Sequence, residues 1–121
     1  LGILPHTISS DIYCKNRISG PVHSLASVMS KFLAIGMTLP EVIDCVTVKA
    51  AEGLRLSQKG RLTPGADADL TLFALRRQST LFVDAENDSL QAEQQIVPLA
   101  ALRAGQWFTT EQGKAEHVFD L

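Results

Sequence analysis

One carboxylate in this sequence stands where it could take part in catalysis. Asp11 follows an apolar run, Leu1 to Ile8, and two small polar residues, Ser9 and Ser10. If the run forms a buried strand, Asp11 lies at its carboxyl end, where α/β enzymes place catalytic side chains on the loops. Aspartate is also common in turns and helix caps, so the local pattern leaves both interpretations open.

The other residue types that support catalysis are scattered along the chain. A hydrolytic metal site needs three or four ligands held close together. No two histidines are paired as His-x-His or His-x-x-x-His; the three are His6, His23 and His117. Cys14 and Cys45 lack metal-like spacing, and the glycines form no phosphate-binding loop. The residues alone therefore offer one candidate catalytic carboxylate and nothing that completes a site.

The composition is that of a soluble globular protein of about one domain. The chain has 121 residues, of which 45% are hydrophobic and 20% charged, and its net charge is -2. No basic block points to nucleic acid or to an anionic membrane surface. No apolar run reaches the roughly 18 residues of a membrane span. We expect a cytoplasmic protein that has neither nucleic acid nor a membrane as its partner.

The spacing of apolar residues predicts helices in the first half of the chain. A polar loop is expected over 13–19. Gly20 and Pro21 then mark a boundary before a helix, because proline suits the first turn of a helix. Apolar residues three and four apart predict an amphipathic helix from Val22 to about Gly36. This helix is expected to pack its apolar stripe on a sheet.

A second helix is predicted over 39–54, because Thr38 and Glu41 have the spacing of a capping box. The character of the sequence changes near residue 57, and β-type runs follow. Strands are predicted over 70–73, 80–84, 95–102 and 106–110, with a turn at Asn87 and Asp88 and a largely polar tail from Glu111. Helices first and strands last indicate two structural regions with a boundary near residue 57.

The segment from Gly60 to Leu70 reads Gly-x-Leu-x-Pro-Gly-x-x-Ala-Asp-Leu. Pro64 and Gly65 suit a type II turn, and we expect Asp67 and Asp69 to be structural carboxylates. Together with the helix before it, this run resembles the C-terminal signature of the amidohydrolase superfamily of metal-dependent hydrolases. The resemblance implies that the chain passes here from a catalytic (β/α)8 barrel to a small β-sandwich.

The first residues resemble the dihydroorotase-like deacetylase branch of that superfamily. The likeness is carried by Leu4, Pro5, Thr7, Ile8, Ser9, Ser10, Asp11, Asn16, Arg17, Gly20 and Pro21. It implies that Asp11 ends the eighth barrel strand, contacts the metal centre and acts as general base toward a metal-activated water. The candidates for shaping the substrate pocket are then Asn16, Arg17 and Gly20; the alternative is that they form a plain structural loop.

The fold class expected from this resemblance is α/β, as the C-terminal fragment of a metal-dependent hydrolase. Residues 1–56 would be the last strand and helices of its TIM barrel, and residues 57–121 part of its β-sandwich. The family's His-x-His pair, its bridging lysine and its two later histidines have no counterpart here. The start at Leu1, inside an apolar run, also suggests a piece of a larger protein.

The intact enzyme is expected to hydrolyse an amide, cyclic amide or ester in a small-molecule substrate, with one or two divalent metal ions, zinc being the expected ion. This chain alone would be inactive. Helices that lack the rest of a barrel expose apolar faces, so we expect it to bind the rest of its parent enzyme or itself. A homo-oligomer is otherwise expected only by analogy. The alternative function is a non-catalytic module that serves packing or association.

Overall fold

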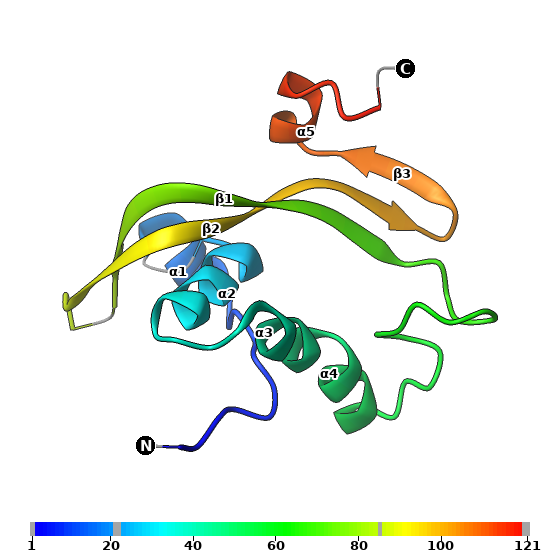
Figure 1. The fold of residues 1–121 in the computed structure, drawn as a ribbon, viewed down its shortest axis with the longest axis horizontal. Helices are drawn as coiled ribbons and strands as arrows, with labels where there is room; N and C mark the ends of the chain where they lie inside the picture. Colours follow the sequence, from blue (N-terminus) through cyan, green and yellow to red (C-terminus); the bar gives the residue numbers. More distant parts are fainter. Residues whose placement is uncertain (1, 21–22, 85, 120–121) are drawn as a thin grey trace.

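The computed structural model describes residues 2–20, 23–84 and 86–119 and builds them around a three-stranded antiparallel sheet in the order β1-β2-β3 (Figure 1). The strands are β1 (Leu70–Val83), β2 (Ser89–Arg103) and β3 (Gln106–Thr109). The helices are α1 (Cys14–Ser19), α2 (Leu25–Ala34), α3 (Leu39–Val46), α4 (Val48–Gly53) and α5 (Glu111–Ala115). In Figure 1, α1 to α4 lie on one side of the sheet and α5 on the other. The chain is therefore α/β, as predicted, with an antiparallel sheet.

One long hairpin makes up most of the sheet. Its register runs from Leu70 opposite Leu102 to Val83 opposite Ser89, so the predicted division into separate strands over 70–73 and 80–84 is wrong. The pairing shifts between Arg77 and Thr80, where β1 bulges. The predicted turn is confirmed, because the Asp84 N–H donates to the Asp88 carbonyl at 3.0 Å and Asn87 has a φ of 65°.

The helices follow the apolar spacing more closely than the strands do. Ser24 caps α2 by accepting the Ser27 N–H at 3.0 Å; the predicted start at Val22 lies outside the described residues. The Thr38–Glu41 capping box is confirmed at the start of α3, with the Thr38 N–H 2.8 Å from Glu41 Oε2. The single helix predicted over 39–54 is broken at Thr47 into α3 and α4.

The core lies between α2, α3 and the inner face of β2. Its buried side chains are Ile8, Met29, Met37, Val42, Cys45 and Ile96. Ser30, in α2, is buried among them: its hydroxyl donates to the Ala26 carbonyl at 2.7 Å and accepts the Ile96 N–H at 3.0 Å. A helix from the first half of the chain is thus fastened to a strand from the second.

Two expectations for the first twenty residues are corrected by the structure. Residues 2–13 form no strand, and Ile8 is held instead by its N–H, which donates to the Cys45 carbonyl at 3.2 Å. A strand needs a neighbouring strand for its ladder, and none of the described strands runs beside this segment. The polar loop predicted over 13–19 contains the short helix α1, whose first turn is tied by Asn16 Oδ1 accepting the Tyr13 N–H at 2.9 Å.

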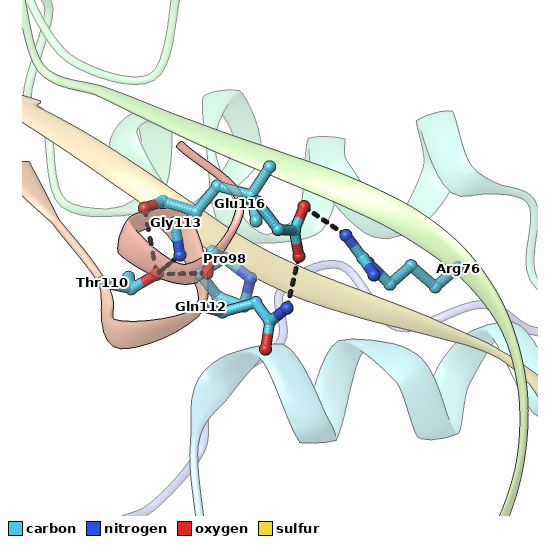
Figure 2. Close-up of polar contacts among 7 residues, drawn as sticks. Arg76, Pro98, Thr110, Gln112, Gly113 and Glu116 are labelled. Atoms are coloured by element: carbon cyan, nitrogen blue, oxygen red, sulfur yellow. Dashed lines mark hydrogen bonds and ion pairs between the residues drawn. The ribbon is translucent and has the colours of Figure 1, made fainter. Parts of the chain in front are cut away.

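The tail from Glu111, which the sequence presented as largely polar, contains α5, and this helix docks on β2 (Figure 2). Thr110 Oγ1 accepts the Gly113 N–H at 3.0 Å and donates to the Pro98 carbonyl at 2.8 Å. Glu116 forms an ion pair with Arg76 of β1 and accepts a hydrogen bond from Gln112. The end of the described chain is therefore fixed to both long strands.

Candidate functional site

Asp11 lies on the connection between the buried Ile8 and helix α1, with its side chain exposed. Its backbone is left-handed, with a φ of 48°. Its carbonyl accepts a hydrogen bond from Asn16 Nδ2 at 2.7 Å, while Oδ1 of the same amide accepts the Tyr13 N–H. Asn16 thus fixes the backbone on which Asp11 stands, and it leaves the Asp11 carboxylate free of any hydrogen bond to the described residues.

The other end of α1 is shaped by Gly20. Its N–H donates to the Asn16 carbonyl at 2.8 Å, and its φ of 72° is one that a residue with a side chain rarely adopts. A Cβ at this position would lie 3.3 Å from the imidazole of His23. Asp11, Asn16 and Gly20 are therefore brought together in one short segment. Arg17 lies in α1 between them, and its side chain is outside what the structure describes.

The left-handed backbone of Asp11 is unusual for its position. Five non-glycine residues have a positive φ in the described part of the chain: Asp11, Arg55, Asn87, Ala104 and His117. Arg55 and His117 follow the last turns of α4 and α5, and Asn87 and Ala104 lie in the two hairpin turns. A positive φ is common at such places. Asp11 instead precedes a helix, which does not require it. Strained backbone of this kind, costing on the order of 1 kcal/mol, concentrates at functional sites.

The sequence profile described as "Amidohydrolase family" matches residues 7–96, which is most of the chain and includes Asp11 and the segment from Gly60 to Leu70. The chain belongs to the amidohydrolase family. A deacetylase from Enterococcus faecalis (strain ATCC 700802 / V583) is 40% identical to it over 105 residues, a match that covers 87% of this chain and 28% of that protein. The resemblance seen in the sequence is therefore confirmed.

Two solved structures share the fold of this amidohydrolase chain. An adenine deaminase superposes with a TM-score of 0.88 at 38% identity, covering 90% of this chain and 30% of its own. A dihydroorotase superposes with a TM-score of 0.82 at 30% identity, and the match covers 89% of this chain and 29% of the dihydroorotase chain. The chain thus spans less than a third of the length of each of these relatives. No described helix is both long and apolar enough to cross a membrane.

The metal that the amidohydrolase family implies does not fit the described residues by themselves. Nowhere in residues 2–20, 23–84 and 86–119 do three or more side chains of His, Cys, Asp or Glu gather in a group able to hold an ion. A metal centre needs three or four such ligands, and Asp11 can supply one. A complete centre cannot be assembled from this part of the chain.

The family signature from Gly60 to Leu70 has a structural role here. Lys59 Nζ pairs with both Asp67, at 2.9 Å, and Asp69, and the second Asp69 oxygen accepts the Ala104 N–H at 3.2 Å. The hydrogen bond from Lys59, followed by that from Ala104, holds the pKa of Asp69 below its ordinary value. Both aspartates are thus engaged as structural carboxylates, as the sequence predicts.

Proposed function

We propose that this chain is the C-terminal part of a hydrolase that cleaves an amide, cyclic amide or ester bond in a small molecule. Residues 1–56 would complete the catalytic barrel, and residues 57–121 would form part of a β-sandwich. The observation that carries the proposal is the 40% identity to a deacetylase over 105 residues, supported by the superposition on an adenine deaminase and a dihydroorotase.

In this proposal Asp11 is the general base. Its carboxylate is exposed and accepts no hydrogen bond from the described residues, so it is available to take a proton. Asn16 keeps it in place through the backbone, because one amide holds both the Asp11 carbonyl and the Tyr13 N–H. We propose that Asn16, Arg17 and Gly20 also border the substrate.

One or two divalent ions, zinc in our proposal, would supply a polarised water in the intact enzyme. Asp11 would be the only described residue to face them, and every other ligand would come from elsewhere in the protein. Removing the metal from the intact enzyme with a chelator should therefore abolish hydrolysis without unfolding this part of the chain.

The surface of the chain supports the proposal that it is one part of a larger enzyme. Several large apolar side chains are between 71% and 88% exposed; they are Ile3, Ile18, Leu54 and Leu62. They come from the segment before α1, from α1, from the end of α4 and from the loop before β1. Large exposed apolar surface marks an absent partner, and we propose that this partner is the rest of the enzyme.

The test compares the product of the complete reading frame with residues 1–121 alone. Both are assayed against an N-acetyl amino acid, a cyclic amide and an acetyl ester. The complete protein should hydrolyse at least one of them, and the 121-residue chain none. Asp11→Asn removes the base but keeps the size of the side chain, and should lower kcat by about 100-fold to 10,000-fold.

Asp44→Asn is the matched control, because Asp44 is an exposed carboxylate on α3 far along the chain from Asp11. It should leave kcat unchanged. Full activity in Asp11→Asn would remove Asp11 from the mechanism. A reading frame that encodes only this short chain, with no hydrolytic activity, would favour the non-catalytic module instead.

A further inference from the structure

A cleft of about 400 Å³ lies between the end of α1 and the turn end of the β1–β2 hairpin. The residues that line it include Gly20 and His23 after α1, Lys31 of α2, and Phe82, Val83 and Asn87 of the hairpin. Its volume is in the range of pockets that hold small molecules. In Figure 1 the strands β1 and β2 run past α1 and α2 on the way to their turn. The cleft therefore adjoins the segment that carries the candidate site.

Lys31 fastens the hairpin to α2. Its Nζ donates to the Val83 carbonyl at 3.2 Å and lies 5.8 Å from the centre of the Phe82 ring, within the range of a cation–π contact. The lysine side chain is half-buried between the two elements. Lys31 thus contacts both the backbone and a side chain of β1 near the end of the hairpin.

The end of the hairpin is braced by its own turn. Asp84 Oδ1 accepts the N–H groups of Glu86 at 2.8 Å and of Asp88 at 3.0 Å. A side chain that bonds the backbone of its own turn in this way stiffens it. Lys31 contacts Val83, the residue before Asp84, so it joins α2 to the strand end that leads into this turn.

We propose that the end of the β1–β2 hairpin forms one wall of the substrate pocket and that Lys31 is the residue that positions it. This inference rests on the function proposed above, in which Gly20 borders the substrate. Successive side chains of a strand point to opposite faces, and Phe82 turns its ring toward Lys31 on the α2 side of the hairpin, where the cleft lies. The wall that the hairpin presents to the cleft is therefore the half-buried, apolar ring of Phe82. It fits an amide or ester substrate whose part remote from the scissile bond carries an apolar group.

The test uses the complete enzyme and two acetylated substrates, one with a bulky apolar group and one with none. Lys31→Met keeps the length of the side chain but removes the ammonium group, and it should raise KM about tenfold for the bulky substrate alone. The kcat values should stay within about twofold, because Asp11 is untouched. Lys31→Arg restores the cation and should restore KM.

Lys114→Met is the control, because Lys114 is an exposed lysine on α5 whose one ion pair within the described part of the chain is with Glu111. It should change neither KM. Hydrogen exchange should show faster exchange around residues 81–88 in Lys31→Met and an unchanged core. Equal KM values for the wild type and Lys31→Met, or an equal rise for both substrates, would overturn this inference alone. A wild-type enzyme that hydrolyses no amide or ester would overturn the proposed function as well.

Discussion

Replacing Ser30 by alanine is expected to weaken the attachment of α2 to the sheet. Ser30 is 1% exposed, and its hydroxyl accepts the Ile96 N–H at 3.0 Å. Strand β3 pairs with β2 only from Ala100 to Arg103, so it does not reach Ile96. The hydroxyl of Ser30 thus takes the place of a neighbouring strand at this point of β2. Alanine would leave the Ile96 N–H buried without an acceptor.

The expected loss follows from that unsatisfied group. A buried donor that loses its partner costs about 1–3 kcal/mol, and the cavity left by one oxygen adds little. With a urea dependence of about 2 kcal/mol per molar, a loss of about 2 kcal/mol lowers the unfolding midpoint by about 1 M. Urea unfolding of the 121-residue chain, followed by far-UV circular dichroism at two protein concentrations, measures this shift and detects any contribution from association.

Ser57→Ala is the matched control, because Ser57 is exposed in the segment between α4 and β1. Its midpoint should stay within about 0.2 M of the wild type, since surface substitutions of this kind change stability little. A Ser30→Ala midpoint as close as this to the wild type would refute the reasoning, because the Ile96 N–H would then need no acceptor from α2.

Two further predictions concern the contacts that fix the second half of the chain. A Cβ at Gly113 would lie 2.0 Å from the Leu99 carbonyl oxygen. Gly113→Ala should therefore lower the free energy of unfolding by about 2 kcal/mol and speed hydrogen exchange in α5. Unchanged exchange there would contradict the docking of this helix on β2. The hydrogen bonds from Lys59 and Ala104 lower the pKa of Asp69 in the folded protein. The stabilisation from Asp69 is therefore present above the unfolded-state pKa and is lost as the pH falls through the folded-state pKa, which lies below 3.8. Urea midpoints measured from pH 7 to pH 3 should therefore fall less steeply in Asp69→Asn than in the wild type, and parallel curves would count against this effect.

The helices that pack on the sheet could be predicted because their apolar residues recur at helical spacing. The capping box at Thr38 and Glu41 even gave the start of α3. The break after α3 could not be predicted in this way. A Cβ at Gly60 would lie 2.6 Å from the Thr47 carbonyl oxygen, so the loop before β1 packs directly on the backbone where the helix is interrupted. That contact joins residues in different segments of the chain. The local sequence shows only a weak point at the break, the β-branched run Val46, Thr47 and Val48, which lowers helix propensity.

The long strands were divided in the prediction because their middle is polar. Arg76 and Arg77 interrupt the apolar alternation of β1, which a sequence pattern interprets as the end of a strand. In the structure Arg76 faces Glu116, beyond the end of α5, and a bulge follows Arg77. The strand continues because its backbone pairs with β2 on both sides of this polar stretch, and the carboxylate of Glu116 offsets the charge of Arg76. Residues 2–8 show the converse, since their apolar run predicts a strand but finds no described strand to pair with.

The candidate site combines a part that sequence could reveal with a part that it could not. The local sequence allowed Asp11 to be either a turn residue or a catalytic residue. In the structure the two interpretations are compatible, because Asp11 has a left-handed turn conformation and its carboxylate is exposed. The proposed hairpin wall has no signal in the sequence near Asp11. It depends on the bond between Lys31 and Val83, which are 52 residues apart, and on the bulge that lets β1 continue to its turn. Under this proposal, changes in the hairpin sequence alter which substrates bind while leaving the position of Asp11, set by Asn16, unchanged.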